Sequence, residues 1–243
     1  MTEEFPDVNA VGGSDVLRAI LSIAGLTIGL GVTLLFAYGV MVVFGYEGAS
    51  VMSLPIVLAL ETVAILGGIY FALVRTGRLT WRDLGWIPVS PGWMVAGGLT
   101  SLAIYAAAIA LVTLARTVLG DAWFGVTPPL VDVFPRSVLG FLGSFVFGAI
   151  TVPIAEEFLF RGLLFRWLRN RWGFSAGAFV SALVFALVHP QASGSAPLIF
   201  LIGLALAYFY ERSGSLWPSM VLHGVNNAVG IAFIYLAIWA GQT

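Results

Sequence analysis

The 243-residue sequence contains no cysteine, no lysine and few charged residues of any kind. Without cysteine, the chain can form no disulfide, thiolate nucleophile or thiolate metal ligand, so any catalysis must use carboxylates, histidines, hydroxyls or backbone groups. Without lysine, Schiff-base chemistry is excluded. Charged residues make up 9% of the chain and the net charge is −1, so no basic surface is available for a nucleic-acid partner.

Apolar residues make up 60% of the chain, and the mean hydropathy is +1.00. A soluble domain of this composition could not cover its surface with solvated groups, so the sequence predicts a membrane protein. Seven apolar blocks approach the length of about 20 residues that a spanning helix needs. They cover residues 17–46, 51–74, 92–118, 137–160, 175–189, 196–210 and 216–240. The expected fold class is all-α, a polytopic membrane bundle of about seven transmembrane helices, within a range of six to eight.

The residues outside these blocks predict the domain organisation and the orientation. Residues 1–15 are polar, acidic and contain glycine, so we expect a disordered N-terminal tail, followed by a single transmembrane domain over residues 16–243. If the tail is cytoplasmic, eight arginines fall on its side of the membrane and two on the other, as the positive-inside rule requires. The short, lysine-free chain favours a prokaryotic plasma membrane as the location of this multi-pass protein.

Six ionisable residues lie within or beside the apolar blocks, where a charge costs at least about 2.5 kcal/mol at the bilayer centre. They are Glu61, Glu156, Glu157, Arg161, His189 and His223, which include both histidines of the chain. Each histidine alone is equally consistent with a polar contact between packed helices, but two histidines with a pair of glutamates indicate a functional site. Glu61 is interpreted as a contact to a neighbouring helix, in preference to a partner of that site.

Three pairs of residues are spaced four apart, so each pair projects from one face of its own helix. The pairs are Glu157 and Arg161, Phe185 and His189, and His223 and Asn227. The first pair is expected to form an ion pair, which leaves Glu156 for another task. If the chain reverses at Trp172 and Gly173, then Glu156 and His189 each lie sixteen residues from the turn, at a similar depth.

Prolines stand close to these residues. Pro153 precedes the adjacent glutamates, Pro190 follows His189 and Pro218 precedes His223. Proline interrupts helical hydrogen bonding, and broken helices in lipid usually line a water-filled cavity. The pattern therefore predicts a hydrated cavity, which hydrolysis within a bilayer requires.

In chain order, Glu156-Glu157-x-x-x-Arg161, Phe185-x-x-x-His189 and His223-x-x-x-Asn227 resemble the three-motif signature of the CPBP intramembrane proteases, also called the CAAX-protease and bacteriocin-processing or Abi family. The motif-bearing region, about residues 137–240, is the expected catalytic core. The resemblance implies an intramembrane endopeptidase whose substrates are membrane-associated proteins or peptides. Members of the family process the C-termini of prenylated CAAX proteins in eukaryotes and other peptides in prokaryotes.

The resemblance also implies catalytic roles. Glu156, with His189, would activate the water that attacks the scissile carbonyl. His223 and Asn227 would stabilise the oxyanion, and one such donor is worth roughly 2.7–4 kcal/mol.

Three further motif positions are expected to support the site. Arg161 would neutralise Glu157, because two adjacent carboxylates resist ionising together. Phe185, one turn from His189, would shape the wall of the pocket.

The sequence leaves open whether a metal takes part. Glu156, His189 and His223 could form a zinc site of two histidines and one carboxylate, with a fourth position for water. Against zinc, the chain lacks the HExxH spacing of most zinc peptidases, and neither imidazole has an evident carboxylate partner in the sequence. We prefer water activation without a metal and keep zinc as the alternative.

Three other functions match parts of the sequence. GFSAG at residues 173–177 fits the G-x-S-x-G pattern, so a serine intramembrane protease could use Ser175, although a serine at this point is also an expected helix N-cap. A transporter also buries Glu, His and Arg in broken helices, but its paired halves are not evident here. A non-enzymatic peptide-binding or immunity protein would not require complete motifs.

Overall fold

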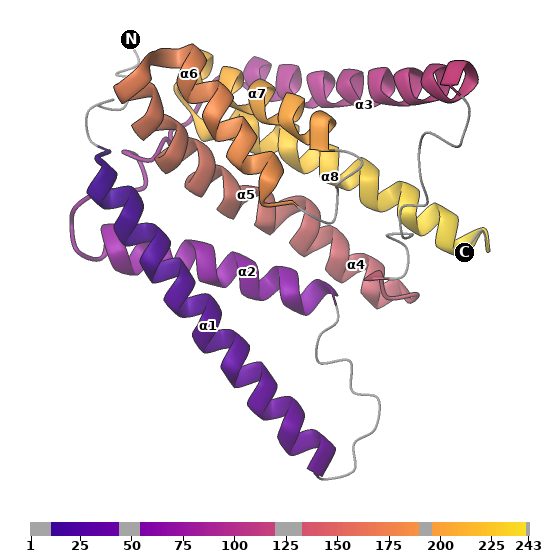
Figure 1. Ribbon diagram of the computed structural model, residues 1–243, viewed down its shortest axis with the longest axis horizontal. Helices are drawn as coiled ribbons and strands as arrows, with labels where there is room; N and C mark the ends of the chain where they lie inside the picture. The colour runs from indigo at the N-terminus through magenta and orange to yellow at the C-terminus, as the bar shows by residue number, and fades with distance from the viewer. Residues whose placement is uncertain (1–10, 44–53, 120–132, 190–195, 242–243) are drawn as a thin grey trace.

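The computed structural model describes residues 11–43, 54–119, 133–189 and 196–241 (Figure 1). Its helices are α1 (Gly13–Val43), α2 (Leu54–Ile69), α3 (Pro91–Leu119), α4 (Val138–Val146), α5 (Val152–Glu157), α6 (Arg166–Leu187), α7 (Ala196–Ser213) and α8 (Leu216–Trp239). Three π-helical stretches extend or join them: η2 (Tyr70–Val74), η5 (Phe147–Thr151) and η6 (Phe158–Phe165). These ranges contain no strand, and six helical stretches in them are long and apolar enough to cross a membrane. The predicted all-α, polytopic membrane bundle is confirmed.

The longest of these stretches, Val138–Leu187, turns back on itself at Gly173 (Figure 1). Its 50 residues would measure about 75 Å if straight, far more than a bilayer is thick. Gly173 has φ 78° and ψ 174°, which favours glycine, and a Cβ at Gly177 would lie 2.8 Å from the backbone nitrogen of Arg169. Residues 138–172 and 174–187 are therefore two neighbouring antiparallel arms, as the sequence predicted.

Pro153 alters the first arm just before the glutamates. A proline has no N–H, so one helical hydrogen bond is missing at this point. The π-helical turn η5 lies directly before it, and there the Val152 N–H donates to the carbonyl of Phe147. The second π-helical stretch, η6, follows directly after Glu157. The glutamates thus occupy a short α-helical segment between two widened ones.

The first helix begins inside the segment that the sequence predicts to be a disordered tail. Helix α1 starts at Gly13, and Asp15 is buried in its first turn. The Asp15 carboxylate accepts a hydrogen bond from the Gly12 N–H at 3.1 Å and from Arg78 at 2.9 Å. These bonds cap the helix and tie it to the loop after α2, so the helix begins before the predicted boundary at residue 15. Residues 1–10 lie outside the described ranges.

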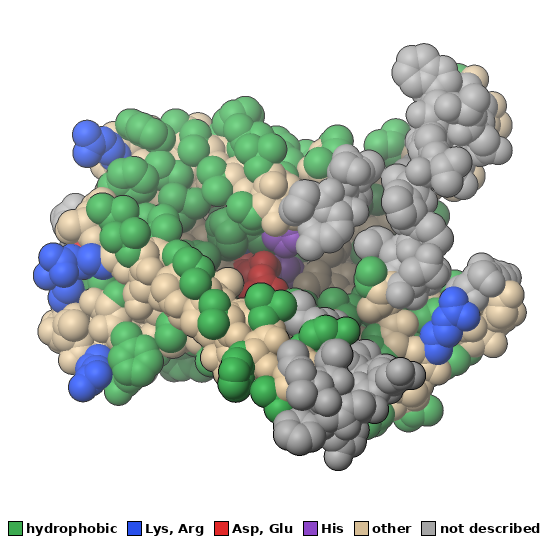
Figure 2. All heavy atoms as spheres, turned by 60° about the horizontal axis from the view of Figure 1, so that its bottom comes forward, with side chains coloured by type: hydrophobic (Ala, Val, Ile, Leu, Met, Phe, Trp, Pro, Cys, Tyr) green, Lys and Arg blue, Asp and Glu red, His purple; other side chains and the backbone are tan. Residues whose placement is uncertain are grey.

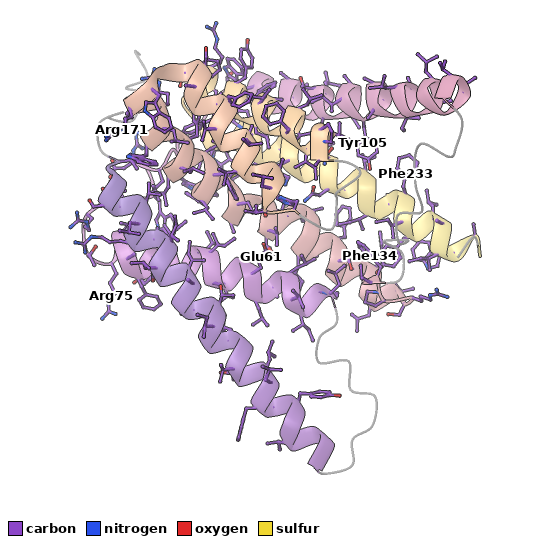
Figure 3. All side chains as sticks on the ribbon, in the orientation of Figure 1. Glu61, Arg75, Tyr105, Phe134, Arg171 and Phe233 are labelled. Carbon is purple, nitrogen blue, oxygen red and sulfur yellow. The ribbon has the colours of Figure 1, made fainter. Side chains whose placement is uncertain are left out.

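Arginines gather at the end of the bundle where α1 begins. Figure 3 labels two of them at this end: Arg75, which follows η2, and Arg171, which lies in α6. Arg169 pairs with Glu211 at 2.8 Å and so joins α6 to α7 there. Elsewhere, large apolar side chains on α1 and α3 are exposed, as expected for surfaces that face lipid.

Candidate active site

Helix α5 carries two adjacent buried glutamates that have different partners. Arg161 Nη1 donates to Oε1 of Glu157 at 2.8 Å, and neither side chain is more than 1% exposed. The guanidinium also donates to the Gly203 carbonyl of α7 at 3.2 Å, and its Cζ lies 4.5 Å from the centre of the Phe185 ring. The ion pair expected from the spacing is therefore present, and it compensates a carboxylate in a position shielded from water. Glu156 faces the two histidines instead.

His223 on α8 contacts both glutamates. Its Nδ1 lies 3.1 Å from Oε1 of Glu157, and its Nε2 lies 3.5 Å from Oε2 of Glu156. Because Glu157 is paired with Arg161, its carboxylate is an acceptor, so we assign the proton of this contact to Nδ1 of His223. Glu157 is thus the carboxylate partner of the His223 imidazole. The sequence did not reveal this partner, because the two residues lie on different helices.

His189 stands at the end of α6, where the chain leaves the helix. Its Nδ1 lies 2.6 Å from the carbonyl oxygen of Phe185, which can only accept, so Nδ1 is the donor. This bond aims Nε2 at Glu156, whose Oε1 lies 3.6 Å away. The Phe185 ring contacts both histidines, with its centre 4.6 Å from that of His189 and 5.5 Å from that of His223. Phe185 thus lies where the sequence placed it, in the wall of the site.

The Glu156 carboxylate is the meeting point of three helices. Its two oxygens face the Nε2 atoms of His189 and His223, each slightly beyond hydrogen-bond distance. Within the described part of the chain, Oε2 of Glu156 is buried and has no hydrogen-bond partner. A small polar molecule beside this carboxylate could therefore reach the acid and both imidazoles.

Asn227 binds the backbone that Pro153 disturbs. Its Nδ2 donates to the carbonyl of Gly148 at 2.9 Å, within η5. In the π-helical pattern the donor for that carbonyl would be residue 153, and a proline cannot donate. The neighbouring Asn226 makes a long contact of 3.5 Å with the Asn227 side chain. One N–H of the Asn227 amide therefore binds the backbone, and the second N–H is left to donate to another group.

Gly224, next to His223, allows α8 to approach this segment closely. A Cβ at Gly224 would lie 2.7 Å from the carbonyl oxygen of Ala149. Real side chains do not pack at that distance, so only glycine permits this contact between α8 and η5. The close approach brings the His223 imidazole to the two glutamates.

These side chains open onto a cavity of about 980 Å³ that lies between α1, α2 and the helices carrying the motifs. Glu156, His189, His223 and Asn227 line it, and most of the remaining wall is apolar. Figure 2 shows acidic and histidine side chains at the bottom of a hollow surrounded by apolar ones. The four residues that the sequence singled out as catalytic thus share one cavity.

Glu61 and Ser175 are placed differently from the four motif residues. Glu61 of α2, which was expected to contact a neighbouring helix, instead lines the cavity and lies within electrostatic range of Glu156 and His189. The signal in the sequence is a carboxylate in an apolar helix, which none of the three motifs includes. Ser175 is exposed just after the Gly173 turn and is not among the described residues that line the cavity.

The three candidate metal ligands converge, but not as a ligand set. Among the described residues, no group of three or more histidine, aspartate or glutamate side chains is arranged to hold a metal ion. Both imidazole Nε2 atoms face opposite oxygens of the same Glu156 carboxylate. Because zinc needs at least three such ligands directed at one point, the arrangement of the described side chains does not fit a zinc site.

Comparison with known proteins places the site within a recognised domain. Residues 138–229 match the model of a family described as type II CAAX prenyl endopeptidase Rce1-like. An uncharacterized 24.3 kDa protein of Escherichia coli is 34% identical over 88 residues, which are 35% of this chain and 41% of that protein. The UPF0177 protein YaiF of Lactococcus lactis is 33% identical over 98 residues, which are 40% of this chain and 43% of that protein.

The alignments therefore cover less than half of each curated relative, and no solved structure matches the chain. The matched segment contains all three motifs and the helices that bring them together. Residues 138–229 are thus similar to the Rce1-like family of type II CAAX prenyl endopeptidases, in agreement with the resemblance of the three motifs.

Proposed function

We propose that this protein is an intramembrane endopeptidase that hydrolyses peptide bonds of membrane-associated proteins or peptides. The observation that carries the proposal is the convergence of Glu156, His189 and His223, from three helices, on one cavity. The match to Rce1-like endopeptidases supports the reaction class. Both curated relatives come from bacteria, which supports a bacterial plasma membrane as the location.

In the proposed reaction, Glu156 acts as the general base. A water beside the Glu156 carboxylate transfers a proton to it while the water oxygen bonds to the carbonyl carbon of the substrate. His189, held by the Phe185 carbonyl, orients this water through Nε2. The carbon–nitrogen bond then breaks, and the proton on Glu156 passes to the leaving amine.

The oxyanion of the intermediate needs hydrogen-bond donors. Asn227 can offer the N–H that Gly148 does not use, and His223 can offer Nε2–H in its imidazolium form. Arg161 and Glu157 act indirectly, because they fix the orientation of the His223 ring. The proposed reaction requires no metal ion.

The test is cleavage by the purified full-length protein in detergent, with new N-termini in a membrane-anchored peptide library read by mass spectrometry. We expect Glu156→Gln to lower the cleavage rate by about 10²–10⁴-fold, the range for loss of a general base. Ser175→Ala is the matched control and should cleave at the wild-type rate. Loss of cleavage in Ser175→Ala with retention in Glu156→Gln would establish the serine mechanism instead. Absence of any cleavage by the wild type would favour a peptide-binding protein or a transporter.

A further inference from the structure

Glu61 brings a second carboxylate to the cavity, and it comes from outside the matched segment. It belongs to α2 (Leu54–Ile69), whereas the Rce1-like segment begins at residue 138. Its neighbour Thr62 is hydrogen-bonded to Thr151 at 2.9 Å between the two hydroxyl oxygens, which fixes α2 against the turn that precedes the glutamates. Figure 3 labels Glu61 on α2, beside the α4–α5 arm. The position of this carboxylate is therefore set by the same packing that holds the catalytic segment.

The charges around the cavity are unbalanced. Among its described lining residues, the ionisable side chains besides Tyr105 are Glu61, Glu156, His189 and His223, and none is an arginine. Glu157 is compensated by Arg161, but no hydrogen bond or ion pair joins Glu61 to another residue of the described ranges. A carboxylate in a mostly apolar cavity is costly unless it meets a cation or a donor. The proposed hydrolysis thus uses one of the two carboxylates in the cavity, that of Glu156, and gives no role to that of Glu61.

We propose that Glu61 is a specificity-determining residue that binds a cationic side chain, Lys or Arg, of the peptide near the scissile bond. The inference rests on the proposed endopeptidase function and adds the class of substrate to it. The long apolar stem of Lys or Arg packs against the apolar walls while its charged end reaches Glu61. An acidic side chain at the same position meets Glu61 and Glu156 and is rejected by repulsion.

The test uses three pools of fluorescent peptides, randomised over Ala, Leu, Ser and Gly and differing only in a central Lys, Gln or Glu. Dissociation constants are measured on the full-length protein carrying Glu156→Gln, which prevents turnover, with and without Glu61→Gln or Glu61→Arg. Cleavage of the same pools is measured with proteins that retain Glu156, again with and without the Glu61 substitutions. Glu211→Gln, an acid on α7 away from the cavity, is the matched control.

We expect the Lys pool to bind about tenfold more tightly than the Glu pool when Glu61 is present. Glu61→Gln should bring this ratio close to one, and Glu61→Arg should invert it, while Glu211→Gln leaves it unchanged. An unchanged ratio in Glu61→Gln overturns the inference, as does an equal loss of cleavage on all three pools, which would assign Glu61 to the chemistry. If wild-type protein binds the pools but cleaves none, the proposed function fails, and the binding ratio still decides the role of Glu61.

Discussion

The Nδ1 atom of His223 on α8 lies 3.1 Å from Oε1 of Glu157 on α5. The same oxygen accepts a hydrogen bond from Arg161 at 2.8 Å. Arg161, Glu157 and His223 thus form a chain of charged and polar groups that ends with the imidazole directed at Glu156. The two adjacent glutamates thus have different partners, and in the proposed reaction Glu157 positions His223 while Glu156 meets the reacting water.

Loss of Arg161 should destabilise the protein strongly. Arg161→Gln leaves Glu157 buried without its cation, and breaking a buried pair typically costs about 3–5 kcal/mol of unfolding free energy. Arg75→Gln removes an exposed arginine and should cost less than about 1 kcal/mol. Unfolding in mixed micelles, followed by circular dichroism, measures both. Equal losses in the two variants would contradict the structural role given to the buried pair.

The same pair offers a second comparison. The double variant Glu157→Gln with Arg161→Met removes both charges, so no unpaired ion remains in the bundle. We expect it to unfold with a higher free energy than Arg161→Gln alone. A double variant that is even less stable would show that the hydrogen bonds to Gly203 and His223 matter more than the charge.

A methyl group at Gly224 should displace the site. The added Cβ of Gly224→Ala would stand 2.7 Å from the Ala149 carbonyl oxygen, so α8 must shift and carry His223 away from the glutamates. Overpacking of this kind costs about 1–3 kcal/mol, and we expect peptide cleavage to fall at least tenfold. Gly98→Ala, whose Cβ would meet only Val221 at 3.7 Å and Val225 at 3.9 Å, is the matched control. Similar activities in the two variants would refute the close approach.

The two adjacent asparagines should behave differently. Asn227→Ala removes the donor to the Gly148 carbonyl and an oxyanion donor, so kcat should fall by about 10²–10³-fold. Asn226→Ala removes only a contact of 3.5 Å and should change kcat by no more than about threefold. Steady-state kinetics on one cleaved reporter peptide measures both. If Asn226→Ala is the more damaging change, the oxyanion role belongs to the other amide.

Chelation should leave the activity intact. The side chains of Glu156, His189 and His223 are not arranged as a metal-ligand set, so we expect protein dialysed against a strong chelator to cleave at its original rate. The metal content before and after dialysis is measured by mass spectrometry. A loss of activity that added Zn²⁺ restores would instead establish the metal mechanism.

The elements and motifs that depend on neighbours in the chain could be predicted from the sequence. Apolar block length gives the helices, the i,i+4 spacing gives the Glu157–Arg161 pair, and the glycine after Trp172 marks the reversal. A similar depth for Glu156 and His189 followed from counting residues on either side of that turn, and His189 Nε2 lies 3.6 Å from Oε1 of Glu156.

Contacts between helices could not be predicted in the same way. Spacing along one helix does not say that Nδ1 of His223 would meet Glu157, or that Glu61 of α2 would face the cavity. The effect of Pro153 was foreseen as a break, but the capture of the Gly148 carbonyl by Asn227 depends on how α8 packs. These features come from tertiary packing, which a single sequence does not encode in any local pattern.

The hairpin at Gly173 also decides which compartments the ends of the bundle face. It divides one of six long apolar stretches into two antiparallel arms. If each arm makes its own pass, the bundle crosses the membrane an odd instead of an even number of times. With separate passes for the two arms, we expect Gly13 at the start of α1 and Trp239 at the end of α8 to emerge on opposite sides of the membrane. Figure 1 shows these two helix ends at opposite ends of the bundle. A fluorescent protein fused ahead of α1 and one fused behind α8 would report from different aqueous spaces.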